Sequence, residues 1–473
     1  MDMSDSLARA LSKQNLQPGD VVAAVGDNSV EIWALLKATT SLGLAIAIIN
    51  DSWSARLRNL LLAKVGAQLV IGYGPRGRQS AAANQVDCRL AEDGSLASEG
   101  ERQAARAARV SSQLEGSVEG ALIFCTSGST GDPKCVVSTP RNREFSALTI
   151  GNYLGLTEGQ CVINALSPSF DYGLYQGLLA GRFGLGMDLV RSAQMTGELL
   201  ERIRKGRRIV LPLTPALAAR LCRGMPAGER FPNVEIVSLT GGDTSAGLRQ
   251  KLAAAFPSAK IFAMYGLTEC KRVAYLDPAE FLQRTYSCGR EMAGVTAEIV
   301  GEDGNPVEPG TVGELTIEGE NVCLGYWGDP ETTRKRFRKA ADGRVVLFTG
   351  DRFRRDKDGF LEFISRNDEL VKLRDERVSL ASIEKELRTS GLVLDLSLRI
   401  EEDDLGIPLI TAAVVPENPS ISSGDVLRSF RECISKPGHL PHRVVLVNEI
   451  AITEHGKHVA GAPPQPAPQD FAA

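Results

Sequence analysis

The chain has 473 residues, of which 43% are hydrophobic and 24% charged, and its formal net charge is −4. This length predicts two or three domains, and the composition is typical of a soluble globular protein. The small net charge gives no reason to expect nucleic acid or a membrane surface as partner, and no apolar run reaches membrane-spanning length. Nine cysteines without paired spacing exclude a zinc site and a disulfide framework and favour a reducing cytoplasm.

Residues 1–75 alternate strand and helix signals. Asn28 and Ser29 can cap a helix that runs to about Leu42. Three apolar runs predict strands, at 21–25, 45–49 and 69–71. Strands alternating with helices indicate an α/β fold with a parallel sheet. Residues 76–115, rich in Ala, Arg, Gln and Ser, are predicted to form an exposed connector with a helical part.

A loop at 126–134 reads Thr-Ser-Gly-Ser-Thr-Gly-Asp-Pro-Lys and follows an apolar run, 121–125, that predicts a buried strand. Its glycines let the backbone bend close to a ligand, while its hydroxyls, amides and lysine can bind anionic oxygens. The loop therefore suits a polyphosphate. It is not a Walker loop, because the Gly-Lys-Ser/Thr ending is missing. A Ser/Gly-rich surface loop is the alternative.

The order of residues in this loop resembles the phosphate-binding loop of the AMP-forming adenylating enzymes. This superfamily contains acyl-CoA synthetases, amino-acid adenylation domains and firefly luciferase. The stretch GDVVAAVGDNSVEIWALLKA also resembles the start of these enzymes. The resemblance implies that ATP phosphates are held by the residues of the loop, namely Thr126, Ser127, Gly128, Ser129, Thr130, Gly131 and Lys134.

The next predicted strand, 161–166, leads into Ser-Pro-Ser-Phe-Asp-Tyr-Gly at 167–173. Open α/β sheets place ligands at such strand ends. In the family this stretch lies against the acyl or aminoacyl substrate, which implies contacts from Phe170, Asp171 and Tyr172. Amino-acid-activating members pair an aspartate at the Asp171 position with the substrate amine, but acyl-activating relatives also carry Phe-Asp-Tyr-Gly. A cap on the following helix is an equal alternative for Asp171.

Further strands are predicted at 209–211 and 234–239, and the second ends in Thr-Gly-Gly-Asp at 240–243. Paired glycines allow a flat group to approach the backbone. By resemblance, Gly241, Gly242 and Asp243 form one wall of the adenine pocket. A plain strand-to-helix turn would also use two glycines.

The strand predicted at 261–264 opens into Tyr265-Gly266-Leu267-Thr268-Glu269, which resembles the family's second hallmark. The resemblance implies that Tyr265 stacks on adenine and that Thr268 contacts the α-phosphate. It also implies that Glu269 binds Mg²⁺, for which a carboxylate oxygen is suited. Gly266 lies beside both nucleotide and substrate in this reading, and Leu267 lies beside the substrate.

From residue 297, short alternating strands separated by turn residues predict a small β-rich subdomain. Within it, Phe-Thr-Gly-Asp at 348–351 resembles the family's ribose-binding motif. The resemblance implies that Asp351 accepts hydrogen bonds from both ribose hydroxyls, for which a short carboxylate is suited. Without the resemblance, a Gly-Asp pair would indicate a hairpin turn.

Residues 365–368, Ser-Arg-Asn-Asp, resemble the hinge before a mobile C-terminal domain, although Ser365 replaces a glycine. Arg366 would face the nucleotide and Asp368 would be the pivot. We therefore predict a large ATP- and substrate-binding domain at 1–365 and a small mobile α+β domain at 366–460. The Pro/Ala-rich end, 461–473, is predicted to be disordered.

Near the C-terminus, Thr-Glu-His-Gly-Lys at 453–457 carries a lysine in the position of the family's late catalytic lysine. Its interpretation depends on position, since Gly-Lys pairs are common. All four histidines, His439, His442, His455 and His458, also lie in this part of the chain. We expect them to be solvated, because no cysteine or acidic pattern nearby indicates a metal site.

The resemblance covers residues from about 16 to 459 and implies attack of a carboxylate on the α-phosphorus of ATP, with release of pyrophosphate. Carboxylate and triphosphate repel each other, so positioning and charge neutralisation would dominate catalysis. Mg²⁺ on Glu269 would screen the phosphates, and Lys457 would bridge carboxylate and α-phosphate. The C-terminal domain would then rotate, and the acyl group would pass to the thiol of CoA or of a carrier protein's phosphopantetheine.

One departure from the family pattern concerns this second step. Asp375 stands where a glycine normally falls in the stretch after Lys372, and its carboxylate would oppose anionic CoA. The sequence thus predicts an AMP-forming carboxylate ligase. The alternatives are amino-acid adenylation with carrier loading, or a relative that binds a nucleotide without turnover. The ligase is favoured by six matching residues: Lys134, Thr268, Glu269, Asp351, Arg366 and Lys457.

Overall fold

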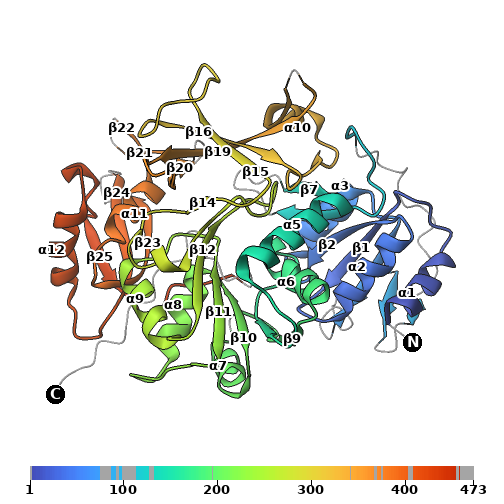
Figure 1. Cartoon of the computed structure of the whole chain (residues 1–473), viewed down its shortest axis with the longest axis horizontal. Coiled ribbons are helices and arrows are strands. Elements are labelled where there is room, and N and C mark those ends of the chain that lie inside the picture. Colours follow the sequence, from blue (N-terminus) through green and yellow to red (C-terminus); the bar gives the residue numbers. More distant parts are fainter. Residues whose placement is uncertain are drawn as a thin grey trace.

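The computed structural model describes residues 3–74, 87–91, 95–98, 113–126, 133–193, 195–340, 342–366, 370–373, 376–402, 408–453 and 458. Two large sheets with parallel centres lie beside each other, and three smaller sheets complete the molecule (Figure 1). The predicted α/β class is therefore confirmed. Among the described residues, no helix combines the length and the apolar character needed to cross a membrane.

The first large sheet has eight strands in the order β17-β7-β6-β2-β1-β3-β4-β5. Its centre is parallel, because β2 pairs with β1 and β6, and β1 pairs with β3. Alternate side chains of β1 enter different cores: Val22 and Ala24 face one, and Val21 and Val25 face the other. The strands are β1 (Val21–Gly26), β2 (Ala45–Asn50), β3 (Leu69–Tyr73), β4 (Cys88–Leu90), β5 (Leu96–Ser98), β6 (Leu122–Thr126), β7 (Lys134–Ser138) and β17 (Gly325–Tyr326).

The second large sheet has seven strands in the order β14-β13-β12-β11-β10-β8-β9. Strands β8, β9, β10, β11 and β12 form its parallel part. One buried core joins it to the first sheet, since Ile46 and Leu122 of the first and Val210 and Ile236 of the second belong to the same cluster. The strands are β8 (Cys161–Asn164), β9 (Gly186–Leu189), β10 (Ile209–Leu213), β11 (Val234–Leu239), β12 (Lys260–Tyr265), β13 (Ala274–Leu276) and β14 (Arg290–Glu291).

Helices pack on both large sheets, α5 and α6 lie between them (Figure 1), and α11 and α12 pack on the C-terminal strands. Thr139 begins α5 with a capping box that it forms with Asn142. The helices are α1 (Met3–Ser12), α2 (Glu31–Ser41), α3 (Ala55–Val65), α5 (Pro140–Leu154), α6 (Asp171–Phe183), α7 (Thr196–Lys205), α8 (Pro215–Gly224), α9 (Ala246–Ala255), α10 (Pro330–Arg336), α11 (Leu380–Leu387) and α12 (Ser423–Cys433).

The three smaller sheets follow in the second half of the chain. The five-stranded one is antiparallel and contains β15 (Val295–Val300), β16 (Val312–Gly319), β18 (Phe337–Lys339), β19 (Val345–Arg355) and β20 (Leu361–Arg366). A two-stranded sheet contains β21 (Leu370–Leu373) and β22 (Glu376–Ser379). The last contains β23 (Val393–Glu402), β24 (Pro408–Pro416) and β25 (Arg443–Leu446).

The C-terminal strands and helices have a core of their own, which includes Ile383, Leu387, Ile410 and Phe430. Strand β23 of this part packs on α8 and α9 of the second large sheet. A separate core supports a separate C-terminal domain, but the boundary at 365/366 stays a prediction. The predicted tail, 461–473, lies outside the described residues.

Three local predictions were wrong. Strand β7 follows the 126–134 loop directly, where only a helix was expected, and it pairs antiparallel with β6. The connector contains strands β4 and β5, which extend the first sheet at its edge. Asn28 does not cap α2, because its side-chain amide instead donates to the carbonyls of Asn164 and Val190. The helix begins after Val30, which forms no side-chain cap.

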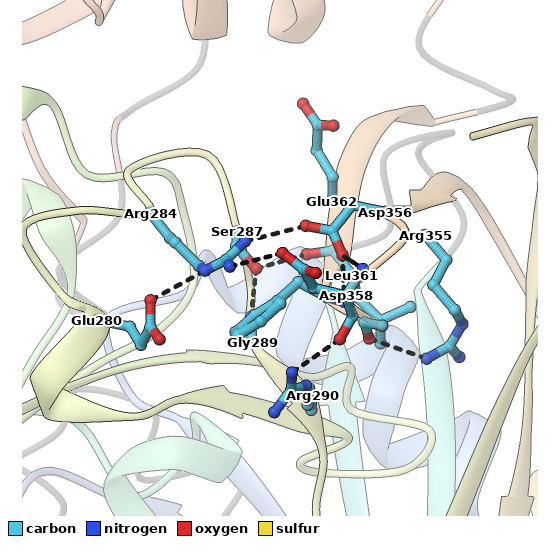
Figure 2. Close-up of polar contacts among 12 residues, drawn as sticks. Glu280, Arg284, Ser287, Gly289, Arg290, Arg355, Asp356, Asp358, Leu361 and Glu362 are labelled. Carbon is cyan, nitrogen blue, oxygen red and sulfur yellow. Dashed lines mark hydrogen bonds and ion pairs between the residues drawn. The ribbon is translucent and has the colours of Figure 1, made fainter. Parts of the chain in front are cut away.

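The β19–β20 hairpin is fixed to the second large sheet at its turn (Figure 2). Arg284 donates to the carboxylates of Asp356, at 3.1 Å, and Asp358, at 2.8 Å. Its guanidinium also lies 3.9 Å from the ring centroid of Phe360. The Leu361 amide donates to the Gly289 carbonyl at 2.8 Å. These contacts hold the hairpin whose far end carries two predicted site residues, Asp351 and Arg366.

Candidate active site

A cavity of about 380 Å³ opens at the carboxyl ends of β11 and β12, a size typical of small-molecule sites. The second large sheet, the five-stranded sheet and the C-terminal part contribute to it. Its lining includes seven predicted nucleotide-binding residues, Gly241, Gly242, Asp243, Tyr265, Gly266, Asp351 and Arg366, and the predicted substrate residue Leu267. The C-terminal part adds Ala381, Glu384, Arg388, Asp395 and His458.

Asp351 is the polar centre of this cavity. Its carboxylate accepts a hydrogen bond of 2.6 Å from the Tyr265 hydroxyl and lies 3.3 Å from Nε of Arg366. Burial raises the pKa of Asp351, although Arg366 and the Tyr265 hydroxyl oppose this rise. The carboxylate is thus desolvated but held in a fixed orientation, which suits recognition of a polar ligand group.

Backbone geometry explains two of the glycines that line the cavity. Gly241 has φ +92°, a conformation that favours glycine, and it leaves the wall beside Tyr265 without a side chain. At Gly266, a Cβ atom would lie 1.7 Å from the carbonyl oxygen of Lys271. The Tyr265–Glu269 turn therefore packs against the returning chain as bare backbone.

Glu269 and Lys134 are linked through Tyr326, which the sequence reading missed. The Tyr326 hydroxyl donates to Oε1 of Glu269 at 2.6 Å, and the Lys134 ammonium lies 5.6 Å from the centroid of the same ring. The turn carrying Thr268 and Glu269 thus lies near the end of the 126–134 loop. A tyrosine has no motif of its own, so only the fold could place it here.

The substrate stretch contributes one buried acid that has no hydrogen-bonding partner among the described residues. Asp171 is 4% exposed, and its carboxylate accepts no hydrogen bond from another described residue. The capping alternative was wrong, because Phe170 occupies the N-cap position of α6 and Asp171 is the first helical residue. The Tyr172 hydroxyl is bonded to the carbonyl and hydroxyl of Ser238, each at 2.7 Å. Phe170 lies edge-on to Tyr172.

A buried ionic cluster lines the C-terminal side of the cavity. Nε2 of His458 lies 2.7 Å from Asp395, which also pairs with Arg388 at 3.2 Å. Burial opposes ionisation of Asp395, but the contacts with His458 and Arg388 outweigh it and lower its pKa. The expectation of solvated histidines was therefore wrong for His458. Sequence reasoning missed this cluster because its members lie far apart in the chain.

Several predicted site residues fall outside the described part of the chain. They are Ser127, Gly128, Ser129, Thr130 and Gly131 of the loop, the pivot Asp368, the late lysine Lys457, and Asp375. A second cavity of about 980 Å³ lies between the start of α5 and the five-stranded sheet. It is lined by none of the predicted residues that the structure describes, so we assign the active site to the smaller cavity.

A model of the AMP-binding enzyme family matches residues 1–327. The chain belongs to the AMP-binding enzyme family. Curated relatives of this family include 2-succinylbenzoate–CoA ligase of Geobacillus kaustophilus, which is 28% identical over 447 residues, covering 94% of this chain and 87% of the relative. Bacitracin synthase 1 of Bacillus licheniformis is 24% identical over 462 residues, covering 96% of this chain but 8% of that much longer protein.

Solved structures of AMP-binding enzymes share the fold. Anthranilate CoA ligase AuaEII, in complex with anthranoyl-AMP, aligns with a TM-score of 0.79 at 19% identity, covering 96% of this chain and 89% of that one. ATP-bound MatB from Rhodopseudomonas palustris aligns with a TM-score of 0.76 at 22% identity, covering 96% and 90% of the two chains. The predicted family is confirmed, and the fold extends over nearly the whole chain.

Proposed function

We propose that this AMP-binding enzyme activates a carboxylic acid as an acyl-adenylate, with release of pyrophosphate, and then transfers the acyl group to a thiol. The cavity that gathers Tyr265, Asp351 and Arg366 beside the bare Gly241-Gly242 backbone carries this proposal. It supplies a flat wall, an aromatic residue and an oriented carboxylate. A nucleoside presents the matching groups, a planar base and a diol.

The nucleotide and the acid would lie on opposite sides of the Tyr265–Glu269 turn. Asp351 would accept hydrogen bonds from the ribose hydroxyls, and the flat wall of Gly241 and Gly242 would contact adenine. Thr268 would contact the α-phosphate, and the 126–134 loop would hold the other phosphates. The acid would extend toward Phe170, Asp171 and Tyr172.

Charge neutralisation would be shared between side chains and Mg²⁺. The described residues contain no cluster of three acidic, cysteine or histidine side chains that could hold a metal alone. Glu269 nevertheless fits, because Mg²⁺ is commonly bound by one or two carboxylates together with substrate phosphates. When bound, Mg²⁺ would screen the triphosphate. Lys134 would add positive charge near the loop, and Lys457 would bridge the incoming carboxylate and the α-phosphate.

The C-terminal part would move between the two half-reactions. Residues 366–460 would rotate about Asp368, withdraw Lys457 and admit the thiol of CoA or of a carrier protein's phosphopantetheine. The free thiols of all nine cysteines support a reducing cytoplasm as the place of action.

Amino-acid adenylation with carrier loading is a second candidate, and one observation favours it. Asp171 is a buried carboxylate to which no described residue donates a hydrogen bond. An α-amine of the substrate would supply a cationic partner.

Pyrophosphate exchange with the purified full chain tests the proposed function directly. The assay measures acid-dependent return of labelled pyrophosphate into ATP over a panel of fatty, aromatic, dicarboxylic and amino acids. We expect exchange with one class of acid and none without Mg²⁺. ATP binding without exchange for every acid would instead establish a nucleotide-binding relative without turnover.

A further inference from the structure

Two buried cations follow the Tyr265–Glu269 turn, and they point into different surroundings. Lys271 is 1% exposed and Arg272 is 5% exposed. Lys271 has φ +61°, a backbone conformation that is uncommon for a residue other than glycine and that often marks a functional site. Asn321 fixes the peptide after this turn, because its amide donates to the Arg272 carbonyl at 2.9 Å. Removal of a charge from water is costly, so each cation needs compensation.

Lys271 has its compensation within the protein. Its ammonium donates to the Thr268 carbonyl at 2.7 Å and lies 4.0 Å from the ring centroid of Phe124. Burial raises the pKa of the Cys323 thiol. Glu269 and Asp171 add to this rise, and Lys271 opposes it. The buried lysine and two acids therefore share one region of the site.

Arg272 has the same two kinds of contact, a backbone carbonyl and an aromatic ring, but its guanidinium has more donors to satisfy. Its Nη1 donates to the neighbouring Lys271 carbonyl at 3.0 Å, and its guanidinium lies 4.6 Å from the ring centroid of Tyr172. It forms no ion pair with any described side chain. By contrast, the buried guanidinium of Arg388 pairs with Asp395 and Glu384. Among the described residues, one protein acceptor thus faces five fixed N–H donors.

The surroundings of Arg272 are phenolic rather than acidic. Burial raises the pKa of Tyr153, and it raises the pKa of Tyr172 to about 12, while Arg272 opposes the rise for both hydroxyls. No carboxylate of a described residue is among the groups that shift the pKa of these two hydroxyls. The Tyr153 hydroxyl contacts Sδ of Met264 at 2.9 Å, and Met264 lines the nucleotide cavity.

Arg272 lies directly behind the wall between the nucleotide cavity and the substrate stretch. A Cβ atom on Gly266, which lines the cavity, would lie 2.9 Å from Cα of Arg272. On its other side the guanidinium faces Tyr172 of the substrate stretch. An acid whose carboxylate reaches the Thr268 turn would therefore extend toward this guanidinium.

We propose that Arg272 binds a second carboxylate of the substrate, so that the acid activated by this enzyme is a dicarboxylic acid. This inference rests on the proposed adenylation. A planar guanidinium can bind a carboxylate through two parallel hydrogen bonds, which an ammonium or an amide cannot reproduce. The anion would supply the charge partner that the described protein residues lack, and Tyr172 would form one face of the subsite.

The test compares dicarboxylic acids with their monomethyl esters, which keep the shape but lose the second charge. Pyrophosphate exchange is measured for succinate, glutarate and phthalate, for the three esters, and for butyrate and benzoate. For at least one diacid, we expect kcat/KM to exceed that of its ester by about tenfold or more, equivalent to ~1.4 kcal/mol. Equal or better use of the esters, or activity confined to monoacids, overturns the dicarboxylate inference and leaves adenylation standing. Absence of exchange with every acid, including the wider panel above, overturns both.

Two variants separate recognition from folding. Arg272→Gln should reduce the diacid-to-ester ratio to about one, while the KM for ATP stays unchanged. Arg249→Gln is the matched control, because Arg249 is also buried, stacks 4.8 Å from the Phe281 centroid and donates to a backbone carbonyl. It should keep the ratio of the parent. If Arg272→Gln does not fold, Arg272→Lys replaces it and should lower the ratio in part. An unchanged ratio in the folded variant contradicts the role of Arg272.

Discussion

Tyr265 of β12 donates a hydrogen bond of 2.6 Å to Asp351 of β19, which joins the second large sheet to the antiparallel sheet inside the cavity. Asp351 is also the strand partner of Arg366. Two sheets and the start of the C-terminal part thus meet at one carboxylate. The group expected to bind ribose is therefore placed by tertiary structure rather than by its own loop.

The substitution Asp351→Asn separates binding from stability. Because the pKa of Asp351 is raised in the folded protein, its contribution to stability is present below the unfolded pKa and is lost as pH rises through the folded pKa. At neutral pH the free energy of unfolding of the variant should therefore be no lower than that of the parent. It should bind ATP more weakly by about 1.5–3 kcal/mol, the worth of hydrogen bonds to a charged group. Calorimetric titration and denaturant unfolding measure both effects, and unchanged ATP affinity would remove Asp351 from the ribose site.

Lys457 is expected to act in the transition state of adenylation. Lys457→Ala should slow adenylate formation by about 10²–10³, the effect of removing one electrostatic stabiliser, with ATP affinity nearly intact. Single-turnover rates with saturating ATP measure this. Lys335→Ala is the control, because Lys335 pairs with Glu331 on the surface of α10. Equal rates in the Lys457 variant and the parent would exclude the lysine from the mechanism.

His458 follows that lysine and pairs with buried Asp395, so it should influence stability in acid. The pKa of Asp395 is lowered in the folded protein. Its contribution to stability is therefore present above the unfolded pKa of about 4 and is lost as pH falls through the folded pKa. His458→Asn removes one cause of this lowering, so acid unfolding should begin at a higher pH. Circular dichroism during acid titration measures the shift. In an Asp395→Asn background the same substitution should have no further effect, and a persisting shift would contradict the pairing.

Asp171 reports on the substrate's charge. For acids without an amine, Asp171→Asn should change transition-state binding by no more than ~0.5 kcal/mol, since no favourable contact is lost. For an amino acid whose amine pairs with Asp171, the loss should be about 1–3 kcal/mol. The ratio of kcat/KM values in variant and parent distinguishes the two. A large loss with an amino acid would favour carrier loading over the dicarboxylate inference.

Asp375 bears on the second half-reaction. Asp375→Gly should increase CoA thioester formation by about tenfold, because opposed like charges cost of order 1 kcal/mol or more at a binding surface. Pyrophosphate exchange should stay unchanged, since we expect the adenylating arrangement not to use this stretch. Thioester formation followed by absorbance at the thioester band measures the first effect. Rapid transfer to CoA by the parent would identify Asp375 as an ordinary turn residue.

The sequence predicted most buried strands because their apolar runs are continuous. The runs at 21–25, 45–49 and 234–239 correspond to β1, β2 and β11, whose buried positions follow from parallel pairing on both sides. Strand β7 was missed because its neighbouring Thr139 begins a strong helix signal, and a strand of five residues leaves little pattern. The short edge strands β4 and β5 were missed for the same reason.

The site was predictable where a motif is contiguous and unpredictable where it is assembled. Tyr265, Gly266 and Leu267 could be found together, and the structure brings them to one cavity with Asp351. Tyr326, Asp395 and Arg272 gave no signal. Each acquires its role from a neighbour distant in sequence, as Tyr326 does from Glu269 and Arg272 from Tyr172.

The β19–β20 hairpin has unequal ends. Leu361, at the start of β20, is bonded to Gly289, and Arg284 holds the adjoining turn. Arg366, at the end of β20, lies at the cavity just before the predicted pivot. At this end the contacts are those of Asp351 with Tyr265 and Arg366. Rotation of the chain beyond residue 366 would therefore strain the Arg366–Asp351 pair first. Release of the nucleotide would then be coupled mechanically to the change from one half-reaction to the other.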